Sequence, residues 1–331
     1  MEYPKFKVCC RCFTFNHSNF ITDAMNGFTM QETSFPFVCT IVDDASTDGE
    51  QEVIRKYVED NFDFSEGSVA YHKETDYAHI TYAQHKTNKN CYFAVLYLKE
   101  NHHSQKKPKM GYLSEWRDMC EYEALCEGDD YWIVPDKLEK QIRIMDENPE
   151  CMLSFHAVNE IYMKNCSLNH IRSNVENREY TGLEWFLNRP AQTASFVIRR
   201  NIYDQEFYKT QVVGKFPAGD IPLLLSCAKF GSLIGLSEVM SVYRHNDGGW
   251  TSQIRTKEET WKIANSHLHF EIFGEDYKRA AQFFYQRECI GYFCTCLKRR
   301  RLALEFLVAS LKVSLKGTLK SIKLVLSNRY A

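Results

Sequence analysis

The chain has 331 residues, of which 44% are hydrophobic and 25% are charged, and its formal net charge is −2. This length is sufficient for one large domain or two smaller ones with a full apolar core, and the composition is ordinary for a globular protein. The sequence contains no run of about 18 apolar residues, no repeat and no low-complexity segment, so neither a membrane-spanning helix nor a repeat architecture is predicted.

The first 150 residues alternate between predicted strands and helices. Strands are expected at residues 5–14, 37–42, 78–82, 93–98 and 121–126, and helices at residues 19–28, from 46 to about 61, and after Pro135. The basic and polar residues 100–111 are expected to form a loop. Such alternation predicts an α/β protein with a mainly parallel sheet and helices on both of its faces.

The pattern changes after residue 150. Strands are expected at residues 151–158, 195–199, 233–236 and 239–243, with a long polar connection between the first two. An apolar helix is expected at residues 220–230, and everything after Lys257 has a helical pattern. The last part of the chain is therefore predicted to be a helical region.

Thirteen cysteines are distributed along the chain, and its first residues lack the apolar core of a secretion signal. We therefore expect reduced thiols and a cytoplasmic protein. Cys9 and Cys12 have the spacing of half a zinc site, but no second half with suitable spacing follows. Because cysteine is among the most buried residue types, we expect these thiols to be free and buried.

Two pairs of adjacent aspartates follow short apolar runs. Asp43 and Asp44 follow the strand at residues 37–42, and Asp129 and Asp130 follow the strand at residues 121–126. Adjacent carboxylates repel each other and therefore need a cation or hydrogen-bond donors. Ligands of open α/β sheets bind at the carboxyl ends of the strands. The two pairs therefore predict one site for a polar ligand and a divalent metal ion.

Five short motifs follow one another along the chain: Cys12–His17, Val42–Asp48, Glu127–Trp132 with Pro135–Leu138, Gly219–Leu223, and Tyr243–His245. Taken in order, they resemble those of the family 2 nucleotide-sugar glycosyltransferases of the bacterial kind that builds surface polysaccharides. The resemblance covers roughly residues 5–252, and the order and spacing of the motifs make it specific.

The resemblance implies a GT-A fold, which has a Rossmann-like sheet, in a domain of residues 1–255. Residues 1–150 would form its nucleotide-sugar-binding half and residues 151–255 the half with the acceptor site and the catalytic base. Residues 256–331 would form the helical C-terminal region with its basic tail.

The resemblance also implies which residues bind the donor. Thr14, Phe15 and Asn16 would contact the nucleotide. Asp44 would accept a hydrogen bond from the ring N–H of uracil. Asp43 would line the same site, with a cap of the following turn as the alternative.

Asp129 and Asp130 match the family's metal motif, with Asp130 as the direct ligand of Mn²⁺ or Mg²⁺ and Asp129 also close to the donor. Hard divalent ions bind carboxylate and phosphate oxygens, and the ion would neutralise the departing diphosphate. Asp220 begins a helix about 90 residues later and would be the general base of an inverting reaction. The alternatives are turn residues for the pair and a helix cap for Asp220.

Other residues keep two interpretations. Lys106 and Lys107 are either phosphate partners or part of a solvated loop. His245 and Trp250 are either contacts of a lid or acceptor site or, for Trp250, the anchor of a surface loop. His156 is either a packing residue in a strand or an acceptor contact.

The residues from 291 onward carry +8, whereas residues 1–290 carry about −10. In this tail, leucines and an isoleucine recur at helical spacing beside a stripe of lysines, which suits a helix in an anionic membrane interface. The alternative is a helix packed on the catalytic domain. Nucleic-acid binding is not expected, because no aromatic residues interleave with the lysines.

The sequence thus predicts an inverting, metal-dependent transferase that moves one sugar from a UDP-sugar to a glycan acceptor. The acceptor would be lipid-linked, and the protein would act in the cytoplasm at the inner face of the membrane. Single transfer is indicated because the Gln-x-x-Arg-Trp motif of processive synthases is absent. The alternatives are a nucleotidyltransferase and a non-catalytic, membrane-associated protein that binds nucleotide-sugars.

Overall fold

The computed structural model describes residues 3–162, 167–171, 175–216, 218–246 and 257–327. It divides into two compact units. The first, here called the sheet unit, comprises Met1–Thr181, Asn188–Gln205 and Phe230–Asn246. The second, the helical unit, comprises Gly182–Leu187, Glu206–Lys229 and Asp247–Ala331. Two segments before residue 255 therefore group with the C-terminal helices, a division that differs from the predicted domain limits.

The sheet unit is built on a sheet of 12 strands, with the order β10-β12-β8-β11-β6-β1-β2-β5-β4-β3 and with β7 and β9 paired to β12 and β8. The strands are β1 (Val8–Thr14), β2 (Phe37–Asp43), β3 (Tyr71–Glu74), β4 (Ala78–Gln84), β5 (Cys91–Leu98), β6 (Tyr122–Leu125), β7 (Tyr131–Trp132), β8 (Cys151–Tyr162), β9 (Ser167–Ile171), β10 (Arg178–Tyr180), β11 (Val197–Arg199) and β12 (Ser232–His245).

The centre of the sheet is parallel. β6, β1, β2 and β5 run in the same direction, and their register places Thr14 opposite Asp43. The predicted α/β class with a parallel sheet is therefore confirmed. Antiparallel pairings lie on both sides of this centre, where β11 joins β6 and β4 joins β5. The carboxyl ends of β1 and β2 consequently meet at one edge of the sheet.

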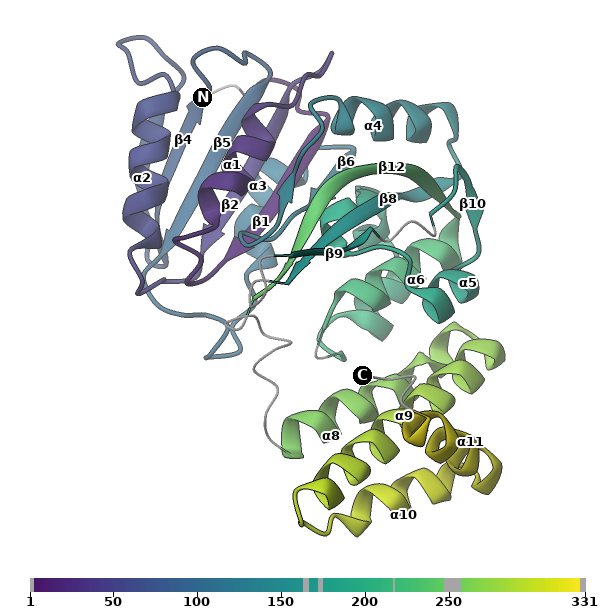
Figure 1. Cartoon of the computed structure of the whole chain (residues 1–331). Helices are drawn as coiled ribbons and strands as arrows, with labels where there is room; N and C mark the ends of the chain where they lie inside the picture. The colour runs from purple at the N-terminus through teal and green to yellow at the C-terminus, as the bar shows by residue number, and fades with distance from the viewer. Residues whose placement is uncertain (1–2, 163–166, 172–174, 217, 247–256, 328–331) are drawn as a thin grey trace. The chain divides into compact units, whose positions relative to one another are not determined.

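Helices cover both faces of the parallel centre (Figure 1). α1 (Ile21–Thr29), α2 (Glu50–Asn61) and α4 (Lys137–Glu147) pack on one face, with a core that includes Phe28, Ile54 and Leu138. The turn η1 (Met110–Leu113) and α3 (Ser114–Arg117) pack on the other face through Leu113 and Trp116. Figure 1 shows α1 and α2 in front of the sheet and α3 behind it.

Buried cysteines contribute to both layers of this core. Cys10, Cys12 and Cys39 face α1 and α2, whereas Cys9 and Cys120 face the other layer. Ten of the twelve described cysteines are buried, and all twelve are free thiols. The prediction of free, buried cysteines is therefore confirmed for these ten.

The helical unit contains most of the remaining helices. They are α5 (Gly182–Asn188), η4 (Tyr208–Val212), α6 (Asp220–Phe230), α8 (Lys257–Ser266), η5 (His267–Phe273), α9 (Glu275–Lys298), α10 (Leu304–Val313) and α11 (Leu315–Leu326). Its C-terminal core joins α8, α9 and α10 through Ala264, Tyr285, Cys289 and Phe306. Within the described residues, no helix has both the length and the apolar character needed to cross a bilayer.

Most predicted elements are present, with two informative differences. The long polar connection after β8 contains β9, β10 and α5, which its polar composition did not indicate. The strands expected at residues 233–236 and 239–243 form one strand, β12, whose register with β8 shifts between Leu236 and Val239. The turn η2 (Thr193–Ser195) precedes β11, and η3 (Arg200–Asp204) follows it.

Candidate functional site

Hydrogen bonds connect the loop after β1 to the loop after β2. Glu50, at the start of α2, accepts hydrogen bonds from the Thr14 hydroxyl, from the backbone N–H of His17 (2.8 Å) and from the Ser46 hydroxyl (2.8 Å). Asn16 has a left-handed backbone (φ 56°), and its side-chain oxygen accepts from the backbone N–H of Thr47 at 2.8 Å. Glu50 was not anticipated from the sequence, because an acid in the first turn of a helix is common.

The three predicted nucleotide contacts differ in whether their side chains already have hydrogen-bond partners within the protein. The side-chain oxygens of Thr14 and Asn16 are already used within the protein. Phe15, between them, exposes 41% of its surface. Asn16 is also exposed, but Phe15 is the aromatic residue of the three, and a nucleotide base can stack on its exposed ring.

Asp43 has the contacts of a turn cap. Its buried Oδ1 accepts from the backbone N–H of Ser46 (3.0 Å) and from the Gln51 amide (2.6 Å). Its Oδ2 is buried and has no hydrogen-bond partner among the described residues. Burial raises the pKa of this carboxyl, and the hydrogen bonds from Ser46 and Gln51 oppose that effect.

Asp44 is bound by the basic loop that follows β5. Its carboxylate accepts from the backbone N–H groups of His102 (2.7 Å) and His103 (3.0 Å) and from the Lys109 ammonium (2.7 Å). The side chain is 1% exposed. In this conformation, three donors surround the carboxylate that was predicted to receive the uracil N–H.

Lys109 is the cation of this loop that reaches the strand end, and its ammonium also lies 5.2 Å from the centre of the Phe13 ring. The two lysines singled out from the sequence lie elsewhere. Lys107 pairs with Glu100, and Lys106 is exposed with a left-handed backbone (φ 57°). Several cations share this stretch, so no local pattern distinguishes Lys109 from the others.

The second acidic pair follows β6 through a glycine that must lack a side chain. A Cβ on Gly128 would lie 2.0 Å from Thr14 Oγ1 and 2.5 Å from Thr14 Cβ. The Gly128 N–H donates to the Phe13 carbonyl at 3.1 Å. The backbone that carries Asp129 and Asp130 therefore lies directly against the end of β1.

β12 supplies the residues that hold this pair, because it runs antiparallel to β7, directly after Asp130. The Arg244 backbone N–H donates to Asp130 Oδ1, and its guanidinium donates to the Asp129 carbonyl, both at 2.9 Å. The guanidinium also pairs with Asp23. Asn246 donates from Nδ2 to Asp129 Oδ2 at 2.6 Å. The sequence indicated the order of this motif but not its contact with the aspartates.

The pair is buried unequally. The Asp129 side chain is 17% exposed, and its Oδ2 lies 3.7 Å from His17 Nε2. Asp130 is 1% exposed, and its Oδ2 has no hydrogen-bond partner among the described residues. Burial raises the pKa of Asp130 well above its usual range, and the negative charges of Asp129 and Glu127 raise it further.

A divalent cation fits this donor set. An unpaired, buried carboxylate oxygen beside a partly exposed carboxylate is stabilised by a proton or a cation, and carboxylate oxygen is the donor that Mn²⁺ and Mg²⁺ prefer. In the described part of the chain, no three His, Cys, Asp or Glu side chains form a complete metal cage.

The other predicted site residues have different settings. His245 Nε2 lies 2.8 Å from a Glu160 carboxylate oxygen, and its ring stacks on Tyr162 at 4.1 Å. Trp250 lies outside the described residues. Asp220 is the first residue of α6, is partly exposed and belongs to the helical unit, apart from the sheet unit that contains both acidic pairs.

His156 has the contacts of a packing residue. It is fully buried in β8, and its Nδ1 donates to the Ala157 carbonyl at 2.8 Å. Burial lowers the pKa of this imidazole well below its usual range, and the positive charge of Lys137 acts in the same direction. A neutral, buried imidazole is the packing alternative for this residue.

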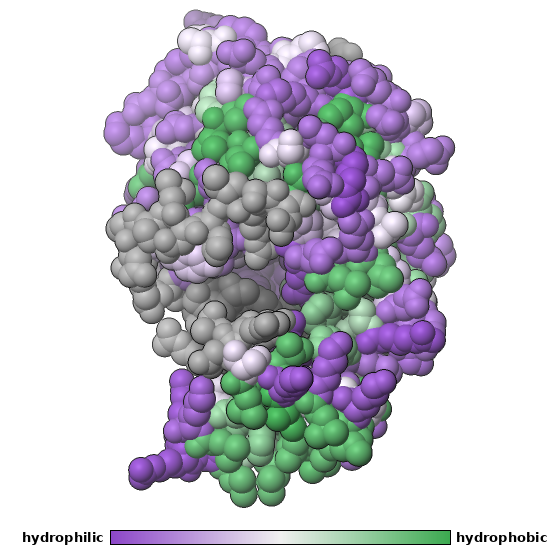
Figure 2. Space-filling view, turned by 45° about the vertical axis from the view of Figure 1, so that its right-hand side comes forward, coloured by the Kyte–Doolittle hydropathy of each residue, from purple (hydrophilic) through white to green (hydrophobic). Residues whose placement is uncertain are grey.

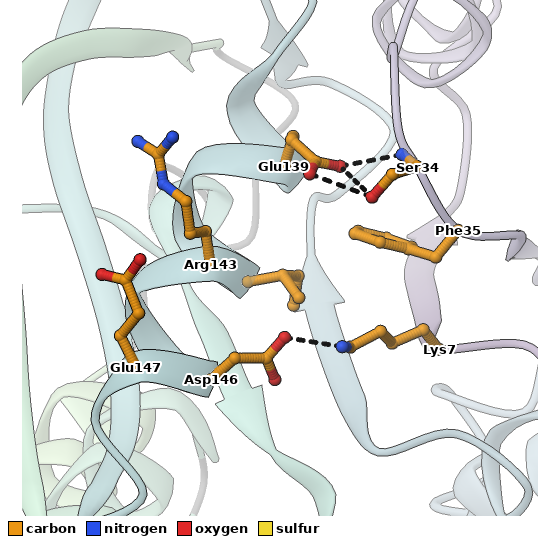
Figure 3. Close-up of a pocket in the computed structure, with 8 residues that line it drawn as sticks. Lys7, Ser34, Phe35, Glu139, Arg143, Asp146 and Glu147 are labelled. Carbon is orange, nitrogen blue, oxygen red and sulfur yellow. Dashed lines mark hydrogen bonds and ion pairs between the residues drawn. The ribbon is translucent and has the colours of Figure 1, made fainter.

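A separate pocket of about 290 Å³ lies beside α4 (Figure 3). Its charged lining is largely paired, since Lys7 binds Asp146 at 2.6 Å and Ser34 donates to Glu139. Lys7 directly precedes β1, whereas the predicted donor residues follow it. This pocket therefore lies at the opposite end of β1 from the acidic site.

A parallel sheet centre with acidic pairs at the carboxyl ends of β2 and β6 is the arrangement of the GT-A fold. Solved structures that resemble the chain have this fold. S. aureus TarS, residues 1–349, in complex with UDP-GlcNAc, superimposes with a TM-score of 0.55 and 14% identity over 98% of this chain and 93% of that one. The mannosyltransferase PcManGT from Pyrobaculum calidifontis, in complex with GDP-Man and Mn²⁺, gives a TM-score of 0.51 and 12% identity over 99% and 89%. At these identities the likeness establishes the fold.

The chain also resembles proteins, found by comparison of sequences, that are themselves uncharacterised. Uncharacterised proteins of Mycobacterium bovis and Mycobacterium tuberculosis are each 28% identical over 262 residues, which is 75% of this chain. The match spans 62% of the length of those relatives. No model of a known protein family matches the chain.

Proposed function

We propose that the protein is an inverting, metal-dependent glycosyltransferase that moves one sugar from a nucleotide-sugar, most simply a UDP-sugar, to a hydroxyl of a glycan acceptor. The observation that carries this proposal is the unpaired Oδ2 of Asp130, buried beside the partly exposed Asp129 at the carboxyl edge of the parallel strands. Ligands of this class of sheet bind at that edge. The fold neighbours were solved with UDP-GlcNAc and with GDP-Man and Mn²⁺, which supports the same ligand class here.

Each residue then has a distinct role. The exposed ring of Phe15 stacks on the base, while Asp129 and Asp130 hold Mn²⁺ or Mg²⁺. When bound there, the ion supplies positive charge for the departing diphosphate. Arg244 is a positioning residue, because it holds Asp130 Oδ1 and the Asp129 carbonyl.

Asp220 is the proposed base. The acceptor oxygen forms a bond to the anomeric carbon as the bond from that carbon to the diphosphate oxygen breaks, and the hydroxyl proton passes to the Asp220 carboxylate. Attack from the side opposite the leaving group inverts the anomeric centre. Asp220 is the first residue of α6, where the helix N-terminus favours an ionised carboxylate able to accept this proton.

The acceptor is proposed to be a lipid-linked saccharide used in the synthesis of a cell-surface polysaccharide. This assignment rests on the resemblance of the motifs and on the basic tail.

The test is a panel of nucleotide-sugars with and without Mn²⁺. A cognate donor at a concentration 100-fold above its Kd should stabilise the protein by about 2.7 kcal/mol, and only with the ion present. Slow release of the nucleoside diphosphate from that donor should accompany binding. Stabilisation by the donor without diphosphate release in the presence of any acceptor would favour a non-catalytic binding protein. No stabilisation by any donor would refute the proposal.

A further inference from the structure

The buried face of the two C-terminal helices is partly polar, because α10 buries Phe306 and Ser310 while α11 buries Thr318 and Ser321. Gln286 on α9 donates from Nε2 to the carbonyls of Ser310 (3.0 Å) and Ser314 (2.8 Å). The Ser310 and Thr318 hydroxyls bond each other at 2.8 Å, and Ser321 is fully buried. These polar groups, and not the leucines, form much of the contact of α10 and α11 with α9.

Close approach makes this arrangement specific. A Cβ on Gly317 would lie 2.0 Å from the Gln286 side-chain oxygen. Gly317 therefore has a packing role. The break between α10 and α11 falls at Ser314, which caps α11 by accepting from the Gly317 N–H at 3.0 Å.

Another face of the same helices is apolar and exposed. Leu315, Leu319 and Leu326 expose 63%, 58% and 70% of their surface. Figure 2 shows hydrophobic residues gathered at the lower end of the view, where Figure 1 draws the C-terminal helices. We call this the leucine face, which comprises Leu302, Leu304, Val308, Leu311, Leu315, Leu319 and Leu326.

Exposed cations accompany the leucine face. Lys312 and Lys316 each follow one of its leucines, and Lys320 follows Leu319. Residues 291–331 contain one acid, Glu305. The exposed basic residues are Lys298, Arg299, Arg300, Arg301, Lys312, Lys316, Lys320 and Lys323.

We propose that the leucine face and its cations dock on the surface of an anionic lipid bilayer, with α10 and α11 lying in the plane of the interface. Contiguous exposed apolar surface marks an interaction site, and an apolar face with flanking lysines and arginines matches a surface with acyl chains below a layer of negative headgroups. A tail that packed on the other helices of its own unit through the leucine face would bury its leucines. Here the serines, Thr318 and Gln286 are buried instead.

This surface differs from a helix seam between protein subunits. A second copy of this chain would bring its own eight cations against these eight, and like charges at an interface oppose association. The bilayer is the occupant whose charge complements the patch. Docking does not depend on the proposed sugar transfer, but it would bring the enzyme to a lipid-linked acceptor.

The test is flotation of the full chain with vesicles of phosphatidylcholine alone or with phosphatidylglycerol. We expect binding to the anionic vesicles, weakened by salt. Leu315→Gln with Leu319→Gln, and separately Lys312→Gln with Lys316→Gln, should each lower the partition coefficient by about tenfold or more. Val213→Gln and Lys209→Gln, which change exposed residues of the same unit, are matched controls and should bind as the wild type does.

Three outcomes would overturn the proposal. Equal binding by the wild type and both double variants would place the lipid contact elsewhere. Equal binding to neutral and anionic vesicles would remove the role of the cations. Self-association in light scattering that is lost in the leucine variant, without vesicle binding, would assign the face to a second copy. Donor stabilisation measured in parallel separates these outcomes from failure of the proposed function.

Discussion

The two units place their polar groups in opposite ways. In the sheet unit, an apolar core is buried and acidic side chains gather at one edge, where Arg244 and Lys109 compensate part of their charge. In the C-terminal helices, Gln286 and several hydroxyls are buried while leucines face solvent. Each arrangement leaves an unfavourable feature in the isolated chain: a buried carboxylate oxygen without a partner, and an exposed apolar face.

This difference underlies the two proposals made above. A partnerless carboxylate is stabilised by a cation, and in the proposed function that cation binds the diphosphate. An exposed leucine face is stabilised by an apolar medium, which is the proposed bilayer. Features that reduce the stability of the free protein are where ligands gain affinity, so we propose a different ligand for each unit.

The largest expected effect is a loss of turnover. Asp220→Asn should lower turnover by about 10²–10⁴-fold, because it removes the proposed general base, while UDP binding to the sheet unit stays nearly unchanged. Steady-state kinetics and calorimetry of the same preparation measure both quantities. Asp276→Asn, an exposed acid of the same unit, is the control. Turnover within a few-fold of the wild type would make Asp220 a helix cap.

A second variant tests how much a buried lysine lowers the free energy of unfolding of the sheet unit. Lys137 is fully buried, its ammonium lacks a hydrogen-bond partner among the described residues and lies 4.0 Å from the Trp132 ring, and burial lowers its pKa to about 7. Lys137→Met should therefore stabilise the protein at pH 7 by on the order of 4 kcal/mol, since burial lowers this pKa from 10.5 to about 7 and each pKa unit corresponds to about 1.4 kcal/mol.

The lowered pKa of Lys137 also predicts how the stability of the folded protein changes with pH. Between pH 7 and about 10, the unfolded chain keeps a proton on Lys137 that the folded chain has lost, so this lysine makes stability rise with pH across that window. Buried thiols with raised pKa, such as Cys9 and Cys12, act in the opposite direction. The difference between wild type and variant in urea unfolding isolates the lysine and should shrink from pH 7 to 9.5. A constant difference would show that Lys137 does not titrate there.

Asp130→Asn tests the acidic edge from two sides. With Mn²⁺ present, UDP affinity should fall by about 100-fold, since even residues that only support a metal ligand change metal affinity by about 10–100-fold. Without metal or donor, the same variant should have a higher Tm, because the amide removes a buried carboxylate whose pKa is raised. Metal-independent UDP binding equal to wild type would exclude Asp130 as the metal ligand.

In the helical unit, Gln286→Leu should destabilise the protein by about 1–3 kcal/mol. The substitution leaves the carbonyls of Ser310 and Ser314 and the Thr318 hydroxyl without their buried donor. Chemical denaturation of both proteins gives the difference. A neutral or stabilising result would mean that the polar contact between α9 and α11 does not contribute to stability.

The smallest effect is expected on the leucine face. Leu319→Gln should change the free energy of unfolding by less than about 0.5 kcal/mol, as substitutions at exposed positions usually do. Leu224→Ala in α6, which is fully buried, should cost about 2–5 kcal/mol and provides the contrast. A large loss for Leu319→Gln would show that the leucine is covered in solution.

The sequence predicted the fold better than the site. Apolar runs that end in Asp43 or precede Asp129 identify strand ends, because burial and a polar terminus are local properties of the chain. The apolar helix expected at residues 220–230 corresponds to α6. The start of α2 differed slightly, since its N-cap is Gly49 (φ 89°), with Asp48 accepting from the Glu50 N–H at 3.1 Å.

Partners far apart in the sequence could not be predicted. Arg244 binds residues more than 100 positions earlier, and Lys109 binds Asp44 from a loop that contains other lysines. Nothing local distinguishes these cations from solvated ones. The sequence also did not show which side of the tail helices packs on α9, because the same leucine spacing suits a buried and an exposed stripe. The residue that distinguishes the two, Gln286, lies on another helix. The roles of the individual site residues stay predictions.

The close contact of Gly128 with Thr14 has a consequence for how this protein and its relatives can diverge. A new side chain at position 128 would meet Thr14 Cβ at 2.5 Å, so shortening the threonine to alanine would not make room for it. No single compensating change is available at position 14 other than another glycine. Across homologues that keep this backbone, we expect position 128 to remain glycine even where the neighbouring acids are replaced. Glycine at this position would then indicate the shared fold independently of catalysis.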